Sequence, residues 1–396
     1  MGKGKRYASS RLNWFLPDGF GFIRNMKQKP PKNYNTFIDL SIGAPNRATP
    51  KPIIDNFAKD IYIDKYHTYP PQFGASELCH SVARWYKKRF SVTIDPDREI
   101  LVTIGIKEAI FNAFHALVNP GDIMLIPDPG YPTYFEAGGF IGAKLVGYNS
   151  NCSQEIQLKE IAELSALHNP NYVVVNYPSN PTGRIVDDSY YEELSALSRK
   201  HDFIVISDLA YSEITFDGRN APSYLYKNDG CERAVEFFAF SKTYNMAGWR
   251  VGVIIAEHEI LEAIKLYKSK IDSNVFYPIQ LAAAYAMDKM EDAFYKQLAF
   301  MYQERRDVLS EGLSAACLEF EKPQGSFYTW VKAPAGWDSW SFTQYIYDTY
   351  GFLGVPGNAY GKNGEGYFRI GLVQEKELMA EVAERLKKGG KIISAR

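Results

Sequence analysis

Apolar and polar positions follow two alternating rhythms along the middle of the chain. Between about residues 99 and 256, short apolar or β-branched runs (123–126, 203–207 and 251–255) are separated by longer stretches of helical period, such as 188–199. Short apolar runs are typical of buried strands, and the helical stretches between them are typical of crossover connections. This part of the chain is therefore predicted to be α/β, with helices flanking a mostly parallel, mixed sheet.

The remaining sequence predicts a smaller domain of the α+β class. Residues 260–305 keep a helical period, long enough for one or two connecting helices, whereas the C-terminal part mixes strand-like runs (327–331, 367–372) with a helical stretch (376–387). Residues 38–42 are expected to add a strand from the other end of the chain. We expect an arm at 1–35, a small domain from 36–60 and 290–396, and a large domain at 61–289.

Composition and charge fit a two-domain globular protein and exclude several function classes. The 396 residues are 46% hydrophobic, and their formal net charge of −1 argues against a nucleic-acid partner. The cysteines (Cys79, Cys152, Cys231 and Cys317) and the six histidines show no disulfide or metal-ligand spacing, so no metal site is predicted. No apolar run is long enough to span a membrane, and we expect a soluble, cytoplasmic protein with no membrane partner.

The strongest candidate for chemistry is a lysine that follows a buried strand. Lys242 comes directly after the apolar run 235–240, and Arg250 lies eight residues further on. A lysine whose pKa is lowered by desolvation or by a nearby cation forms a Schiff base with an aldehyde. The alternative from these residues alone is a solvated lysine in a loop and an arginine in a surface ion pair.

Other strand ends carry polar residues of the kinds that bind cofactors. Asp208 ends the run 203–208, with Tyr211 three residues later, and a buried carboxylate is costly unless it is paired. Residues 172–183 end another strand in a proline-rich turn with Asn176 and Asn180. Gly105 separates a strand-like run from a helix, whose free N–H groups can hold a phosphate, although the segment is neither a Walker A loop nor a dinucleotide fingerprint.

The order of these motifs resembles the class I and II aminotransferases, pyridoxal-phosphate enzymes of fold type I. The resemblance covers roughly residues 38–372 and includes Pro-Gly-Tyr-Pro at 129–132, Asn-Pro-Thr-Gly at 180–183, Ser-Lys at 241–242 and Phe-Arg-Ile at 368–370. It is greatest to the branch of diaminopimelate, alanine, aspartate and aromatic aminotransferases. It implies a homodimer that exchanges an amino group between an L-amino acid and an α-keto acid by a ping-pong mechanism, with Lys242 joined to the cofactor as an aldimine.

The resemblance also implies a role for each matching residue. Lys242 would hold the cofactor and move the substrate proton, Asp208 would pair with the pyridine nitrogen, and Tyr211 and Asn180 would bind the ring oxygen. Arg369 would bind the substrate α-carboxylate, with Gly43 and Asn180 beside it. The remaining cofactor-binding positions would be Tyr131 on the ring face and, around the phosphate, Gly105, Ile106, Lys107, Ser241, Arg250 and, from the neighbouring subunit, Tyr69.

Two positions depart from the family pattern. Ala239 stands where the family often has a serine that binds phosphate, and Ile106 stands where a small or hydroxyl residue is common. We expect fewer hydroxyl donors around the phosphate and weaker cofactor retention.

Three other functions stay open at this point. A β-lyase or another enzyme that removes the Cα proton would use the same motifs. A pyridoxal-phosphate-dependent regulator would need a DNA-binding domain before the fold, for which the N-terminal segment is too short. An NAD oxidoreductase would need the glycine fingerprint that this sequence lacks.

Overall fold

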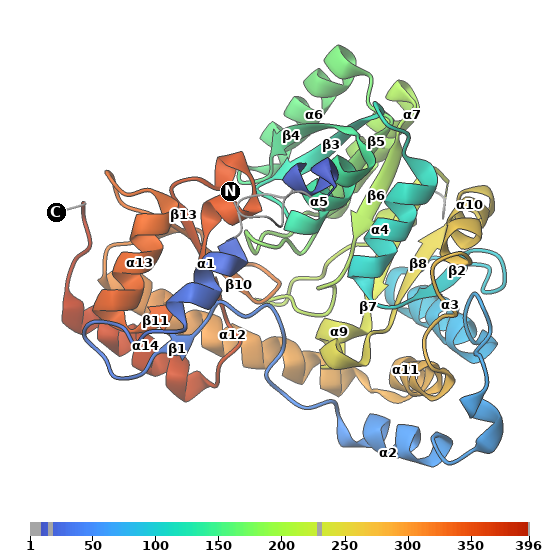
Figure 1. The fold of residues 1–396 in the computed structure, drawn as a ribbon, viewed down its shortest axis with the longest axis horizontal. Helices are drawn as coiled ribbons and strands as arrows, with labels where there is room; N and C mark the ends of the chain where they lie inside the picture. The colour runs from blue at the N-terminus through green and yellow to red at the C-terminus, as the bar shows by residue number, and fades with distance from the viewer. Residues whose placement is uncertain (1–8, 15–18, 228–231, 395–396) are drawn as a thin grey trace.

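The computed structural model describes residues 9–14, 19–227 and 232–394, and a seven-stranded sheet lies at its centre (Figure 1). From one edge to the other, the strands are β2 (Ile100–Thr103), β8 (Gly252–Ala256), β7 (Ala234–Ala239), β6 (Ile204–Asp208), β5 (Tyr172–Asn176), β3 (Ile123–Asp128) and β4 (Lys144–Asn149). Neighbouring strands are parallel except in the two pairs that β8 makes. The predicted α/β class with a mostly parallel, mixed sheet is confirmed.

Each central strand buries both of its faces. In β5, Val173 and Val175 belong to one apolar cluster, whereas Val174 belongs to the other, because successive side chains point to opposite faces of a sheet. The first cluster is covered by α3 (Ser76–Phe90), α6 (Gln154–His168), α7 (Asp188–His201) and α11 (Tyr277–Lys289). The second is covered by α4 (Ile106–Leu117), α5 (Pro132–Ile141) and α10 (His258–Lys268). This double burial explains why the strands read as continuous apolar runs rather than as an alternation.

A smaller α+β part lies beside the large sheet. Its antiparallel sheet, within the described residues, has the order β12 (Val355–Pro356), β13 (Tyr367–Gly371), β10 (Tyr328–Lys332) and β9 (Glu319–Phe320). It is packed with α13 (Ser339–Tyr350), α14 (Lys376–Gly389) and the long α12 (Asp292–Ala315), which extends towards the large part (Figure 1). Residues 38–42 form a shorter strand than expected: β1 (Ile38–Asp39) pairs in parallel with β11 (Phe352–Leu353).

The remaining elements are short. They are the helices α1 (Gly19–Met26), α2 (Lys51–Asp60), α8 (Tyr224–Lys227) and α9 (Phe240–Thr243) and the 3-10 turns η2 (Ser10–Trp14), η3 (Asp64–His67), η4 (Ala247–Trp249), η5 (Gly357–Tyr360) and η6 (Lys362–Gly364). Cys79, Cys152 and Cys317 are free thiols, and Cys231 lies outside the described residues. None of the described helices combines the length and apolar character needed to cross a membrane.

One expectation about helices needs correction. Residues 260–305 fall in three helices, α10, α11 and the first half of α12, rather than in one or two. Between α10 and α11, Asn274 adopts a left-handed backbone (φ +75°), and Pro278 stands in the first turn of α11. α10 ends at Lys268 with Ser269 as its C-cap, Asn274 lies in the connection, and Pro278 favours the start of α11 because proline is preferred in the first turn of a helix.

Candidate active site

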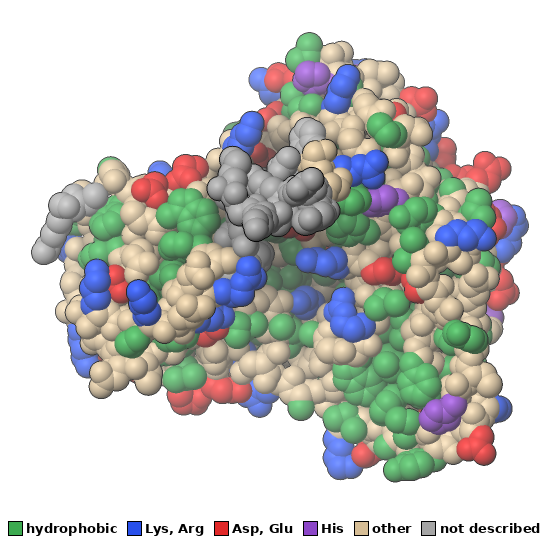
Figure 2. Space-filling view, in the orientation of Figure 1, with side chains coloured by type: hydrophobic (Ala, Val, Ile, Leu, Met, Phe, Trp, Pro, Cys, Tyr) green, Lys and Arg blue, Asp and Glu red, His purple; other side chains and the backbone are tan. Residues whose placement is uncertain are grey.

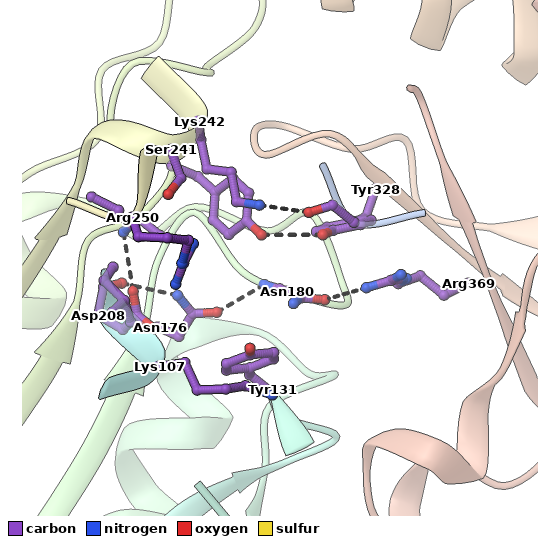
Figure 3. Close-up of a pocket in the computed structure, with 15 residues that line it drawn as sticks. Lys107, Tyr131, Asn176, Asn180, Asp208, Ser241, Lys242, Arg250, Tyr328 and Arg369 are labelled. Carbon is purple, nitrogen blue, oxygen red and sulfur yellow. Dashed lines mark hydrogen bonds between the residues drawn. The ribbon is translucent and has the colours of Figure 1, made fainter. Parts of the chain in front are cut away.

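A pocket of about 230 Å³ lies where β5, β6 and β7 end, facing strands β10 and β13 of the smaller sheet (Figure 3). In parallel sheets, loops and helix N-termini converge at the carboxyl ends of the strands, which is where ligands bind. The space-filling view shows Lys and Arg side chains gathered around the hollow between the two parts (Figure 2). Among the described lining residues, the charged ones are Asp208 and four cations: Lys107, Lys242, Arg250 and Arg369.

Lys242 lies in the short helix α9, which directly follows β7. Its Nζ donates a hydrogen bond to the carbonyl oxygen of Gly43 at 2.5 Å, across the pocket (Figure 3). The residue as a whole is partly exposed, but its amine is enclosed. Burial lowers the pKa of Lys242, the nearby Arg369 and Arg250 cations lower it further, and the pKa that results is about 8. About a tenth of the amine is therefore neutral at pH 7, far more than for an unperturbed lysine, and the neutral form is the one that a nucleophile or general base requires.

Asp208 is the buried carboxyl at the end of β6. Its Oδ2 accepts a hydrogen bond from the Tyr134 hydroxyl at 2.6 Å, and its Oδ1 accepts one from the Ala210 N–H at 3.1 Å. Burial raises the pKa of Asp208 to about 6, against the opposing effect of the Tyr134 hydrogen bond. Among the described residues, no cation lies within ion-pair distance of Asp208, so the carboxylate is available to a cationic ligand group.

A chain of hydrogen bonds joins the large sheet to the smaller one. Asn176, at the end of β5, donates to the Asp208 carbonyl oxygen (2.9 Å) and accepts from the Asn180 N–H (2.9 Å). The Asn180 side-chain oxygen accepts from Arg369 Nη1 at 2.9 Å, and Arg369 Nη2 donates to the Ser41 carbonyl oxygen at 3.2 Å. Arg369 is 2% exposed, and its Nε has no partner among the described residues. The guanidinium is thus held in place with donor capacity left over.

Arg369 also stacks on aromatic rings. Its guanidinium carbon lies 4.0 Å from the ring centroid of Tyr328 and 4.9 Å from that of Tyr360. The Tyr328 hydroxyl in turn lies 3.1 Å from the Tyr211 hydroxyl. These cation–π contacts help to hold the guanidinium in position, which favours a bidentate grip on a carboxylate.

The N-terminus of α4 forms a second anchoring point, which we call the α4 turn (residues 104–107). Gly105 has φ +75°, and a Cβ there would lie 2.5 Å from Arg250 Nη2, so the position requires glycine. Arg250 Nη2 donates to the Ile104 carbonyl oxygen at 3.3 Å. The first N–H groups of a helix have no acceptor within it, and with Arg250 beside them they suit a phosphate.

The structure brings most of the predicted site residues together. Those that line the pocket are Gly43, Ile106, Lys107, Tyr131, Asn180, Asp208, Tyr211, Ser241, Lys242, Arg250 and Arg369. Gly105 lies behind Arg250, and Ala239 and Ile106, the two departures from the family pattern, both line the pocket. Tyr69 does not line it and is 87% exposed.

Sequence reasoning missed two residues that position the site. Tyr134 holds Asp208, and Tyr328 contacts both Tyr211 and Arg369. A possible signal for Tyr134 is its place one helical turn after Tyr131, in the first turn of α5, which starts at the end of a parallel strand. Tyr328 lies on β10 in the smaller part, and no local pattern shows that its ring turns towards the large sheet.

The residues present fit pyridoxal phosphate. A buried carboxylate without a cation suits a protonated pyridine nitrogen, an enclosed amine of lowered pKa suits an aldehyde, and the α4 turn with Arg250 suits a phosphate. Unpartnered donor capacity on buried Arg369 suits a carboxylate of the substrate.

Comparisons with known proteins agree with this fit. Residues 35–386 match the family model described as aminotransferase class I and II. The chain is 38% identical to the LL-diaminopimelate aminotransferase of Moorella thermoacetica, covering 89% of this chain and 90% of the relative. It is 36% identical to that of Natranaerobius thermophilus, covering 96% and 98%. Among solved structures, apo-BacF from Bacillus subtilis matches with a TM-score of 0.88 at 28% identity, covering 96% and 98%.

The family model and the curated relatives span most of the chain, and the pocket holds the groups that the cofactor needs. The protein therefore belongs to the class I and II aminotransferases, which depend on pyridoxal phosphate.

Proposed function

We propose that this aminotransferase acts on an L-amino acid that carries a second carboxylate, and that this amino donor is LL-diaminopimelate. We also propose that Lys242 performs the proton transfer. When bound, pyridoxal phosphate supplies a ring that accepts the electron pair released when the substrate Cα loses its proton. The observation that carries the proposal is the enclosed Lys242 amine with its lowered pKa, in the same pocket as buried Asp208.

Lys242 Nζ removes the proton from the substrate Cα and later returns a proton to the reacting centre. The short helix α9 holds the amine at the pocket wall, and the hydrogen bond to Gly43 shows the reach of the side chain towards the smaller part. With a pKa of about 8, the amine both takes up and releases a proton close to neutral pH, which favours general acid–base catalysis there.

The neighbouring side chains orient the cofactor in this proposal. Asp208, held by Tyr134, keeps the pyridine nitrogen protonated, while Tyr211 and Asn180 donate to the ring oxygen and Tyr131 covers the ring face. The phosphate takes its hydrogen bonds from the backbone N–H groups of Gly105, Ile106 and Lys107 and from Ser241 and Arg250, so the side-chain ammonium of Lys107 is not used. This assignment is supported by Ile106, Lys107, Ser241 and Arg250, which line one pocket, by Gly105 directly behind Arg250, and by the first N–H groups of α4.

Two cations then remain for the substrate. Arg369 grips the α-carboxylate beside Gly43, supported by its stacking on Tyr328. Lys107 lines the same pocket and makes no ion pair with any carboxylate of the described chain, which suits a second carboxylate at the far end of the substrate. LL-diaminopimelate, the compound in the names of the curated relatives, has this second carboxylate.

The proposal includes a homodimer in the cytoplasm, with Tyr69 reaching the partner's phosphate. Tyr62, Ile63, Tyr69 and Phe73 are exposed by 85%, 37%, 87% and 39%, an unusual density of apolar side chains for one short surface segment. The segment includes η3, which packs on α11, where Figure 2 shows hydrophobic side chains at the surface. The three described cysteines are free, as expected in a reducing compartment.

A panel of amino donors tests the substrate and the reaction together. The holoenzyme is mixed with LL-diaminopimelate, glutamate, aspartate, alanine and phenylalanine, and conversion of the bound cofactor to its pyridoxamine form is followed by absorbance. We expect conversion with LL-diaminopimelate at the lowest concentration, and a Lys107→Gln variant should lose this preference while keeping its response to alanine. A cysteine S-conjugate, whose thiolate can leave from Cβ, is included to test for a lyase: release of pyruvate, ammonia and the thiol from it, without the pyridoxamine form, would instead indicate β-elimination.

A further inference from the structure

The buried ammonium of Lys268 lies behind the α4 turn and has no part in the reaction described above. Lys268 is the last residue of α10 and is 1% exposed. Its Nζ donates to Glu108 Oε1 at 3.1 Å and to the two oxygens of Asp272 at 2.7 and 2.8 Å. Burying an ammonium between two carboxylates has a large desolvation cost. Well-packed apolar side chains of similar volume would often stabilise the fold equally well, so stability alone does not explain this group.

Glu108 connects this ammonium to the α4 turn. The residue lies in the first turn of α4, and its Oε2 accepts a hydrogen bond from the Ile104 N–H at 2.9 Å. Burial raises the pKa of the Glu108 carboxyl, and the Lys268 cation opposes that rise. A carboxylate at this helix N-terminus repels any other anion that binds there, and the Lys268 charge offsets the repulsion.

Asp272 connects the same ammonium to the segment that carries Tyr69. Its Oδ1 accepts from the Asn274 N–H at 2.6 Å, and the Asn274 side chain donates to the carbonyl oxygens of Pro71 (3.2 Å) and Gln72 (3.1 Å). One continuous network therefore runs from the α4 turn through Lys268 to residues 71–72.

We infer that Lys268 is a positioning residue for the cofactor phosphate: it neutralises Glu108 beside the α4 turn and ties that turn to residues 71–72. The inference rests on the proposed phosphate position. It differs from a purely structural role because it predicts an effect on ligands that carry a phosphate and none on ligands that lack it.

The test compares pyridoxal phosphate with pyridoxal on the full-length chain stripped of cofactor. In Lys268→Met, the affinity for pyridoxal phosphate falls roughly tenfold, the effect of one weakened hydrogen bond to a charged group, while the affinity for pyridoxal is unchanged. Lys265→Met is the matched control, because Lys265 is a similarly buried residue of the same helix, but its Nζ pairs with Glu262 and lies over the Phe73 ring. An equal loss for both ligands in Lys268→Met would overturn the inference.

A charge rescue distinguishes electrostatics from packing. Glu108→Gln keeps an acceptor for the Ile104 N–H but removes the charge, so the Lys268→Met/Glu108→Gln pair should recover affinity for pyridoxal phosphate. Glu108→Gln alone should raise that affinity and leave pyridoxal unaffected, which tests the inference even if Lys268→Met fails to fold. A fall in affinity for both ligands in Glu108→Gln would contradict it.

Arg250→Lys separates failure of this inference from failure of the proposed phosphate position. If Arg250→Lys does not lose affinity for pyridoxal phosphate relative to pyridoxal, the phosphate lies elsewhere and the proposed function needs revision. If Arg250→Lys shows that loss and Lys268→Met does not, the phosphate position stands and the role of Lys268 is rejected.

Discussion

At the scale of single residues, the site depends on groups whose proton affinity is shifted by burial. Desolvation disfavours a charge of either sign, which is why the pKa of Lys242 is lowered to about 8 and that of Asp208 is raised to about 6. A cofactor that joins the amine and brings a cationic nitrogen to the carboxylate relieves both penalties at once.

Replacing the lysine should abolish turnover without abolishing the fold. We expect Lys242→Arg to lower the turnover rate by at least about a thousandfold, because the guanidinium stays protonated and cannot act as a base. Pyridoxamine phosphate, which makes no bond to the lysine, should still bind, as measured by quenching of protein fluorescence. Retained turnover would rule out the role assigned to Lys242.

Asp208 makes the stability of the cofactor-free chain depend on pH. Its pKa is raised from 3.8 to about 6, so its contribution is fully present below about pH 4 and is lost as the pH rises through 6. Wild type should therefore lose about 2 kcal/mol of unfolding free energy relative to Asp208→Asn between pH 4 and 7. Chemical denaturation of both proteins at several pH values measures this difference. If the unfolding free energies of wild type and Asp208→Asn change in parallel with pH, burial does not raise the pKa of Asp208.

Ala239 tests the expectation of weak cofactor retention. The residue ends β7 and lines the pocket, where a serine hydroxyl would reach a phosphate beside the α4 turn. Ala239→Ser should raise the affinity for pyridoxal phosphate several-fold, about the contribution of one added hydrogen bond. An unchanged dissociation constant would argue against the idea.

At the scale of elements, the carboxyl ends of the strands position the candidate site residues, and the sequence predicts these strands. The apolar runs predict β3, β6, β7 and β8 to within one or two residues, because strands buried on both faces leave a continuous apolar signature. Residues 38–42 and 260–305 were less predictable. A two-residue strand depends on its partner β11, and the helical period of the apolar positions does not show the break between α10, which ends at Lys268, and α11, which begins at Tyr277.

The α4 turn should tolerate no side chain at Gly105. In Gly105→Ala the new Cβ would meet Arg250 Nη2, and the positive φ adds strain, so the affinity for pyridoxal phosphate should fall at least tenfold. Gly121→Ala is the matched control, since Gly121 also has positive φ (+93°) but open space around it. Both variants are titrated with pyridoxal phosphate. Gly121→Ala, which has the backbone strain but no clash at the α4 turn, should keep the wild-type affinity.

At the scale of the whole molecule, the site is assembled from parts that are distant in the sequence. Gly43, Tyr328 and Arg369 come from the smaller part, and the chain Asn176–Asn180–Arg369 ties them to the large sheet. Arg369 was identified through the family motif, whereas the stacking of Tyr328 depends on how the two parts pack and leaves no local signal. The domain boundaries at 35, 60 and 289 stay predictions.

Complementation between subunits tests the shared site. Tyr69→Phe and Lys242→Ala should each be impaired, but mixing and refolding the two variants should form heterodimers in which one site has both Tyr69 and Lys242. We expect up to about a quarter of wild-type activity at equal mixing, since half of the dimers are mixed and each has one intact site. No recovery, despite mixed dimers seen by native mass spectrometry, would contradict the role of Tyr69.

The most direct test of the account is the covalent partner of the cofactor. The holoenzyme is reduced with borohydride, digested and mapped by mass spectrometry. We predict that the reduced cofactor is attached to Lys242 and that Asp208→Asn weakens the attachment without moving it. Attachment to another lysine, or a protein that stays colourless and unlabelled with added pyridoxal phosphate, would contradict the account.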